Sequence, residues 1–429
     1  MLRHKHPDNR NERLKDVLEF LLRDLVPILG FAASIDVWPS RAEEKAVWSD
    51  DGGLKIRLPT SSDNVKSYCL MLSPEAAQDK LCRKVCGEFI RLCRNVLSSK
   101  GQWDIKARLI KSGDFLWDDL VVSLGLSGNQ KYECIDILSA VRESLLFEYE
   151  GIAVQIGVLV TWNLHNTRRK FEEADCILLP FNLHFDLREN LKNRKALNRI
   201  STVRSSVILV SKDSLASHLI LIPSMLRSGD TSDWELVPEN IQRLRQFLMG
   251  RDVLVAGSHA KELFFATHEY VFRWGHKKWS RLSGPALSSV LGQFVDDIVV
   301  QNLRDVVVAM SQAKIGALFV ITQDPISLLK GAKEGVSRQF KSECLFNIKD
   351  VDKWATIRFA AIDGATILTR SGQIVEAGSI LAIPESSASL AEGARTAAAV
   401  HASKFGLAIK VSSDGPISMY VKGKLVRST

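Results

Sequence analysis

The sequence lacks an uninterrupted apolar run of membrane-spanning length. A transmembrane helix needs about 20 consecutive, mostly apolar residues, whereas the best candidate, residues 25–35, is far shorter and directly follows Arg23 and Asp24. The first residues, MLRHKHPDNRNERLKD, are polar and contain no apolar segment of the kind found in signal peptides. We therefore expect a cytoplasmic protein with no membrane partner.

Cysteine is also scarce, with 7 cysteines in 429 residues, an odd number. In a chain without a secretion signal, such usage argues against a disulfide framework. Cys82, Cys86 and Cys93 share one face of a helix predicted for Ser73 to Leu97, and no histidine or fourth cysteine lies nearby to complete a zinc site. Buried core thiols are the favoured interpretation, with a metal or redox site as the alternative.

The chain has no strong excess of either charge. Its 57 basic and 49 acidic residues give a formal charge of +8, spread along the length. This balance weakly favours anionic ligands such as nucleotides and does not by itself indicate DNA. Basic residues are dense between Arg168 and Arg204, but acidic residues are interleaved with them. We therefore expect a solvated helical surface there, and no nucleic-acid partner.

No low-complexity tract interrupts the chain, so folded domains are expected throughout. At roughly 100–200 residues per domain, the length predicts two or three of them. Residues 1–245 alternate helical patterns with β-branched runs such as Ile152–Trp162, which predicts a mixed α/β region. Short strands separated by Gly257-Ser258 and Gly275-His276 predict a β-meander that forms a connecting segment over residues 246–288. Residues 289–429 form the remaining, C-terminal domain.

The C-terminal domain shows the clearest order of elements. An amphipathic pattern predicts one long helix from Ser289 to Ala313, followed by a buried strand at residues 315–321. A second helix ending near Ala361, a hairpin, a helix opening near residue 393 and a final hairpin follow. This order predicts an α/β fold with a mixed sheet covered by helices.

Two short motifs in this domain have the chemistry of a nucleotide site. Asp363 lies between a helix and a strand, where a carboxylate can bind a metal or orient a hydroxyl, and the small Gly364 and Ala365 allow close backbone approach. The second motif, Gly393, Ala394, Arg395 and Thr396, opens a helix, so its backbone N–H groups and the Arg395 guanidinium can meet phosphate oxygens.

These motifs occur in a recognisable order: a GALFVI strand, DGATIL, GART, and VSSDGPIS. The last third of the chain thereby resembles the diadenylate cyclase domain, which includes the nucleotide-binding part of the DNA-integrity scanning protein. The resemblance implies that two ATP molecules are condensed into the second messenger cyclic di-AMP by face-to-face domains of a homo-oligomer, as in bacterial-type signalling. It implies a divalent metal, Mg²⁺ or Mn²⁺, with Asp363 as the metal-binding and catalytic residue. It also implies that residues 1–245 act as a sensor regulating the domain.

The chain departs from the family pattern at one point. Where the family has Arg-His-Arg, this sequence has Arg395-Thr396-Ala397, which removes an imidazole and a cation. His401, Lys404 and Lys410 are candidates to replace the lost groups. Three hypotheses therefore remain open: a regulated cyclase, a catalytically weakened domain that binds ATP or a cyclic dinucleotide as a sensor, and a purely structural oligomerisation module. The retained Asp363 and Arg395 favour the first two.

Overall fold

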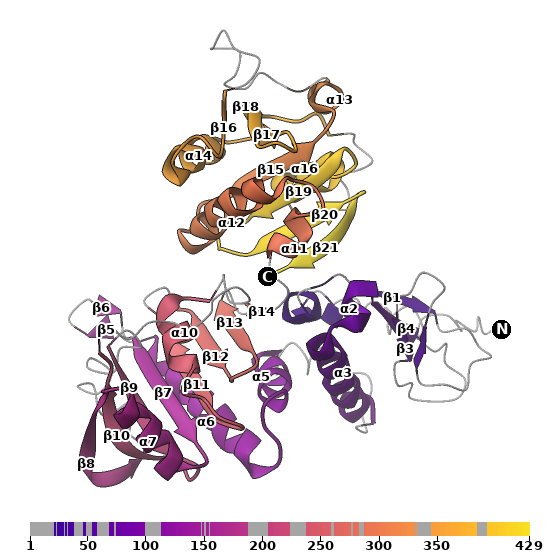
Figure 1. The fold of residues 1–429 in the computed structure, drawn as a ribbon. Helices are drawn as coiled ribbons and strands as arrows, with labels where there is room; N and C mark the ends of the chain where they lie inside the picture. The colour runs from indigo at the N-terminus through magenta and orange to yellow at the C-terminus, as the bar shows by residue number, and fades with distance from the viewer. Residues whose placement is uncertain are drawn as a thin grey trace, which may run out of the picture. The chain divides into compact units, whose positions relative to one another are not determined.

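The fold is taken from a computed structural model of the whole chain. It describes residues 21–22, 24–29, 31, 33–37, 46–48, 54–57, 68–72, 74–98, 113–146, 148–149, 152–153, 155–187, 205–223, 237–258, 261–275, 278–282, 287–330, 332, 345–383 and 393–429. The chain divides into two compact units, one formed by residues 1–29 and 33–284 and the other by residues 30–32 and 285–429. Figure 1 shows the elements of each unit. None of the helices in the described ranges is long and apolar enough to cross a membrane.

The N-terminal unit begins with a small antiparallel sheet in the order β1-β4-β3-β2. Its strands are β1 (Ala33–Val37), β2 (Ala46–Trp48), β3 (Leu54–Arg57) and β4 (Tyr68–Leu72). Two helices follow, α2 (Pro74–Gln78) and α3 (Lys80–Ser98). The single helix predicted for residues 73–97 is thus broken at Asp79. The Asp79 carboxylate accepts a hydrogen bond from the backbone N–H of Cys82, as an N-cap does, so a new helix begins there.

Cysteines of helix α3 confirm the expectation of buried thiols. Cys82 and Cys86 are fully buried, and Cys82 Sγ donates to the Leu29 carbonyl at 3.2 Å. Burial raises the pKa of the Cys86 thiol to about 12, so it stays protonated and unreactive at neutral pH. The side chain of Cys93 lies outside the described residues.

A larger, eight-stranded sheet forms the rest of the N-terminal unit, in the order β14-β13-β12-β11-β7-β9-β10-β8. Among its described strand pairs, only β7 and β9 are parallel. Its first strands and accompanying helices are α5 (Gly113–Ser123), α6 (Asn129–Ser144), β7 (Ile156–Thr161), α7 (Leu164–Glu173), β8 (Ile177–Asp186), β9 (Ser206–Ser211) and β10 (Leu215–Leu221). A separate two-stranded ribbon joins β5 (Glu148–Tyr149) to β6 (Ile152–Ala153). All six residues of β7 are buried, as its continuous apolar sequence predicts.

The meander predicted for residues 246–288 is present but is not a connecting segment. After α10 (Glu239–Arg245), it contributes β11 (Val253–Gly257), β12 (Leu263–Ala266), β13 (Val271–Gly275) and β14 (Lys278–Arg281). Strand β11 pairs with β7 from Val253↔Val160 to Gly257↔Ile156, so the meander continues the larger sheet. Local sequence patterns do not reveal this pairing, because β7 and β11 are far apart in the sequence.

Helix α7 carries the described part of the basic stretch. Arg168 pairs with Glu172 and Arg169 with Glu173, each at i,i+4 spacing and with largely exposed side chains. This is the solvated surface expected from interleaved charges. Residues 188–204 lie outside the described part of the chain.

The C-terminal unit is a seven-stranded mixed sheet in the order β16-β18-β17-β15-β19-β20-β21. Its strands are β15 (Ala317–Thr322), β16 (Phe346–Asn347), β17 (Ala365–Leu368), β18 (Gln373–Ser379), β19 (Gly406–Val411), β20 (Ile417–Val421) and β21 (Lys424–Ser428). Only β15 and β17 run parallel. An isolated bridge from Phe31 to Arg427 ties residue 31 to this unit.

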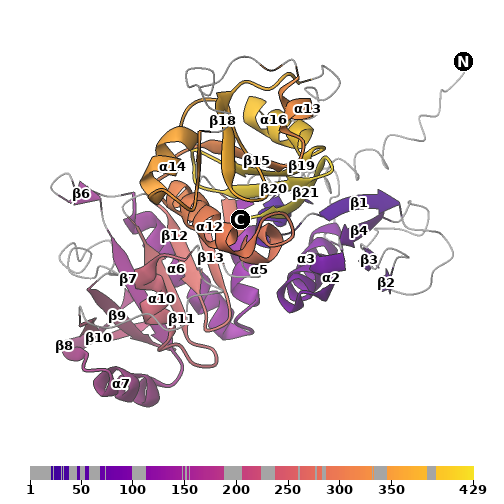
Figure 2. The same cartoon turned by 45° about the horizontal axis from the view of Figure 1, so that its top comes forward.

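Helices cover both faces of this sheet, which confirms the predicted fold class. They are α11 (Leu287–Leu291), α12 (Asp297–Gln312), α13 (Pro325–Leu329), α14 (Lys353–Ala360) and α16 (Ala394–Ala402). Figures 1 and 2 show α12 and α14 side by side on one face and α16 on the other. On the α16 face, Leu318, Val320, Ala399 and Ala408 belong to one buried apolar cluster.

The single helix predicted from Ser289 to Ala313 is wrong, because two helices occupy that range. Helix α11 ends at Leu291, before Gly292, a residue with low helix propensity. Helix α12 starts after Asp296, whose backbone is extended and whose carboxylate lies 3.3 Å from Arg370. This tertiary contact to a distant turn begins the new helix, and the amphipathic pattern does not encode it.

Candidate functional site

The candidate site lies at one edge of the C-terminal sheet. Strands β15 and β17 are parallel, so their starts lie at the same edge. Strand β19 is antiparallel to β15, with Val411 opposite Ala317, so β19 ends where β15 begins. Gly316, Asp363 and Ser413 are therefore brought together from segments far apart in the sequence.

Asp363 follows helix α14 and immediately precedes β17. Its side chain is 90% exposed. The next residue, Gly364, has φ +119, and a Cβ there would lie 2.5 Å from the carbonyl carbon of Gly378. This close approach of the two backbones requires glycine at position 364, whether or not a ligand also contacts it. Ala365 is buried in the core on the α16 face, so its side chain packs inside the protein.

The second motif begins helix α16, as its sequence predicts. Gly393 is the N-cap residue, with φ +94, and it has no side chain to cap the helix. Its carbonyl accepts from the backbone N–H groups of Thr396 and Ala397. Gly393 and Ala394 are exposed, so the start of the helix faces solvent with the positive end of its dipole.

Arg395 links the two motifs. Its Nη2 atom lies 3.6 Å from Asp363 Oδ1. The guanidinium passes directly over the backbone of Gly316, since a Cβ at Gly316 would lie 2.5 Å from Arg395 Nη1 and 3.4 Å from the Ser413 nitrogen. An anionic ligand at this edge would meet the guanidinium, the start of α16 and the end of β19.

A model of a known protein family matches the part of the chain that contains this site. Residues 304–425 match the model of the DAC family, described as "DisA bacterial checkpoint controller nucleotide-binding". The C-terminal unit contains a DAC domain. The matched range begins within α12, ends within β21, and includes both Asp363 and Arg395. The domain therefore belongs to a family of nucleotide-binding domains.

Solved structures also align with part of the chain. A hypothetical membrane spanning protein from Bacillus cereus is 19% identical, over 33% of this chain and 67% of that chain, with a TM-score of 0.25. A double mutant of DacA from Staphylococcus aureus is 26% identical, over 30% of this chain and 85% of that chain, with a TM-score of 0.22. Among curated proteins, none matches the chain.

A second cation of the DAC domain lies beside the altered triplet. Lys410 Nζ donates to Thr396 Oγ1 at 2.9 Å. Lys410 is opposite Leu318 in the β15–β19 register and therefore shares the face that α16 covers. Ala397, by contrast, is 5% exposed and lies on the buried side of α16. The position where the family pattern has its last arginine thus has no ligand-facing side chain here.

The other two candidate replacements lie at the opposite end of α16. His401 is in its last turn and packs edge-on against Phe405, with ring centroids 5.8 Å apart. Burial, followed by the charge of Lys404, lowers the pKa of this imidazole. Lys404 itself is exposed just beyond the helix. Of the three candidates, the structure brings only Lys410 to the site.

Asp363 is the carboxylate that the sequence predicts to hold a divalent metal. Among the residues that the structure describes, no group of three or more histidine, cysteine or acidic side chains could enclose a metal ion by itself. Mg²⁺ and Mn²⁺ prefer oxygen ligands, and Mg²⁺ at nucleotide sites takes one or two carboxylates plus phosphate oxygens. The exposed Asp363 carboxylate fits that ligand set.

Three residues of this edge are weakly signalled by the sequence. Gly316 precedes a buried strand, and a glycine there has many structural explanations. Ser413 lies in a turn beside Asp414-Gly415, which indicates only a hairpin. Lys410 is the one cation in the mostly apolar strand β19, and that isolation is the signal that could have singled it out.

Proposed function

We propose that the C-terminal unit binds ATP and condenses two ATP molecules into cyclic di-AMP. The observation that carries the proposal is the meeting of Arg395 and Asp363, 3.6 Å apart, at a glycine-lined edge of a DAC domain. In the reaction, the 3′-hydroxyl of one nucleotide attacks the α-phosphorus of the other. A new O–P bond forms, pyrophosphate leaves, and the hydroxyl proton is released; two such steps close the ring.

Arg395 and the start of α16 bind the phosphates in this proposal. A guanidinium offers paired N–H donors in a plane, which suits phosphate oxygens. Lys410, held by Thr396, adds a positive charge near the same helix start. Two cations repel one another, and the positive end of the helix dipole repels both of them. A bound anion relieves this repulsion, so the arrangement favours anion binding. Lys410 is therefore a positioning residue that compensates for part of the altered triplet.

Asp363 serves the attacking hydroxyl or the metal. A bound Mg²⁺ or Mn²⁺ supplies charge stabilisation for the phosphates and the leaving pyrophosphate. The Asp363 carboxylate holds the metal or accepts a hydrogen bond from the hydroxyl, while Gly364 and Ala365 present only backbone. Arg395, beside the carboxylate, orients it.

The reaction needs two nucleotides, and one domain offers one such edge. We propose that two copies of the chain face each other so that each contributes one nucleotide. The exposure of Asp363 supports this, because a catalytic group that acts across an interface must be reachable from outside its own domain. The N-terminal unit is proposed to regulate the cyclase, and the protein is proposed to be cytoplasmic.

A second function is favoured by one observation, the burial of Ala397. With no imidazole at Thr396 and no cation at Ala397, the domain would bind ATP or a cyclic dinucleotide and report on it without turnover. A single positioned arginine can contribute roughly 10³–10⁵ to the rate of phosphoryl transfer, so the altered triplet bears directly on this choice.

Asp363→Asn in the full chain separates the two functions. For a cyclase, the substitution lowers ATP turnover by about 10²–10⁴, the usual contribution of an acid–base group, and leaves most of the ATP affinity. For a sensor, the wild type and the variant bind ATP alike and neither turns it over. Asp350→Asn, an exposed carboxylate on the same unit, is the matched control.

A further inference from the structure

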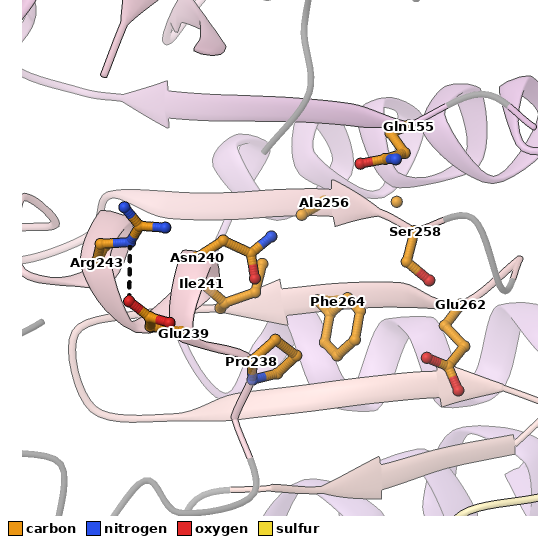
Figure 3. Close-up of a pocket in the computed structure, with 11 residues that line it drawn as sticks. Gln155, Pro238, Glu239, Asn240, Ile241, Arg243, Ala256, Ser258, Glu262 and Phe264 are labelled. Atoms are coloured by element: carbon orange, nitrogen blue, oxygen red, sulfur yellow. Dashed lines mark ion pairs between the residues drawn. The ribbon is translucent and has the colours of Figure 1, made fainter. Parts of the chain in front are cut away.

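The N-terminal unit contains a cavity that is independent of the DAC domain. It has a volume of about 400 Å³ and lies where helix α10 meets strands β11 and β12 (Figure 3). This volume is within the range of sites for small molecules. Its lining combines apolar side chains with amides, a hydroxyl and charges: Gln155, Pro238, Glu239, Asn240, Ile241, Arg243, Ala256, Gly257, Ser258, Glu262 and Phe264.

Beside the cavity, two neighbouring strands carry very small residues. Gly157 lies opposite Ala256 in the β7–β11 register, and Ala256 lies opposite Phe264 in the β11–β12 register. Side chains alternate along a strand, so Ala256 points away from the face of Gly257, where an added Cβ would meet Leu145. Gly157 and Ala256 add little bulk to this face of the sheet, and Ala256 and Phe264 belong to the lining of the cavity.

Next to the ends of β11, β12 and β7, the lining becomes polar. Ser258 donates its backbone N–H to the Glu262 carbonyl at 2.9 Å, and the β7–β11 register continues from Gly257 to place Gln155 beside Ser258. These three side chains form one row across three strands. Figure 3 shows the carboxamides of Gln155 and Asn240 pointing toward the middle of the cavity.

Two buried polar atoms of the lining have no hydrogen-bond partner within the described part of the chain. They are Ser258 Oγ and Arg243 Nε, the latter 3.8 Å from Glu239 Oε1 and thus too far for a hydrogen bond. Buried polar atoms are normally satisfied by protein, water or ligand. These two atoms mark a polar part of the lining, where water or a polar ligand can supply the missing partner.

The side chains identify the chemical class of that molecule. Asn and Gln carboxamides pair bidentately with base edges, carboxylates accept from exocyclic amino groups, and aromatic rings stack on bases. The lining holds two carboxylates, Glu239 and Glu262, and one guanidinium, that of Arg243, which forms an ion pair with Glu239. No surplus positive charge remains for a phosphate. We propose that this cavity binds a nucleobase or nucleoside that carries no phosphate.

Calorimetric titration of the full chain with adenosine, guanosine, cytidine and uridine tests this, alongside the matching 5′-monophosphates. We expect at least one nucleoside to bind, and to bind more tightly than its monophosphate. Asn240→Ala removes a carboxamide from a partly exposed helix position and should weaken that binding by about tenfold, the effect of one lost hydrogen bond of about 1.4 kcal/mol. Ala256→Leu fills the cavity and should abolish binding.

Asp213→Ala is the matched control, since Asp213 is exposed in the turn between β9 and β10 and is outside the lining. Circular dichroism and thermal unfolding of the same samples show whether the N-terminal unit of each variant is folded, and ATP binding is measured alongside. The proposal is overturned if no nucleoside binds the wild type, if monophosphates bind more tightly than nucleosides at the site that Ala256→Leu removes, or if Asn240→Ala and Ala256→Leu both bind nucleosides like the control. ATP binding tests the proposed cyclase separately, so either claim can fail alone.

Discussion

Arg395 Nη2 lies 3.6 Å from Asp363 Oδ1, and this pair joins the two motifs of the DAC domain across the edge of its sheet. The two side chains are 36% and 90% exposed, so the pair adds little to stability. Its importance is geometric. It places a guanidinium and a carboxylate where both remain accessible to a nucleotide and a metal.

Arg395→Ala should weaken ATP binding by about 1.5–3 kcal/mol, the range for hydrogen bonds to a charged group. The unfolding free energy should change little, because the Asp363 pair is exposed. Calorimetry with ATP measures the first quantity and thermal denaturation the second. Lys404→Ala, an exposed cation beyond the end of α16, is the control. Equal affinities in the variant and the control would make Arg395 an ordinary surface cation.

Gly316→Ala should disturb the same guanidinium without breaking the fold. The added Cβ would approach Arg395 Nη1 to 2.5 Å, but this atom ends a flexible side chain, and the φ of Gly316 lies outside the left-handed region. We expect ATP affinity to fall by about 1 kcal/mol, less than for loss of the charge–phosphate contact itself. Gly292→Ala, whose Cβ would meet only the Ser288 carbonyl, should bind ATP normally. Unchanged ATP affinity in Gly316→Ala would refute the close contact.

Lys410→Met should weaken ATP binding by about tenfold, or about 1.4 kcal/mol, and make binding less sensitive to salt, because one cation near the phosphates is lost. Methionine keeps most of the aliphatic volume of lysine. Thr396→Val, which removes the hydroxyl that holds Lys410, should show a smaller effect in the same direction. Lys404→Met is the control. A salt dependence identical to that of the wild type would exclude Lys410 from the phosphate site.

His401 should make the C-terminal unit less stable in mild acid. Burial and Lys404 lower the pKa of the folded imidazole below its ordinary 6.5. Below pH 6.5 the unfolded chain therefore binds a proton that the folded chain resists, so unfolding free energy declines as pH falls from 6.5 through the folded pKa. His401→Gln should flatten this decline between pH 7 and pH 5 in denaturant titrations. Parallel pH profiles of the wild type and the variant would contradict the effect.

The sequence predicts the order of elements in the C-terminal unit well, because strands such as Ala317–Thr322 are continuous apolar runs and Gly393 marks a helix start. The break before α12 is not predictable in this way, because Asp296 contacts Arg370, which is distant in the chain. The break at Asp79 depends on a local cap to Cys82 inside a continuous helical pattern. The meander's place in the larger sheet depends on pairing between β11 and β7, almost 100 residues apart in the sequence.

Within the site, the sequence indicates the chemical role of each motif, but it does not indicate that the two motifs are in contact. Asp363 and Arg395 are joined only by the parallel pairing of β15 with β17 and the return of β19. Gly316 and Lys410 depend on the same pairing. The roles of Asp363, Gly364, Ala365 and the residues from Gly393 to Thr396 in binding or catalysis remain predictions.

The central claim is that this chain makes cyclic di-AMP from ATP. The most direct measurement is the mass spectrum of the products after the purified full chain is incubated with ATP and Mg²⁺ or Mn²⁺ at a series of protein concentrations. The account predicts cyclic di-AMP, with activity per molecule rising with protein concentration until facing pairs are filled. Nucleotide binding without any cyclic di-AMP, at every concentration and with either metal, would contradict it and leave the sensor function in its place.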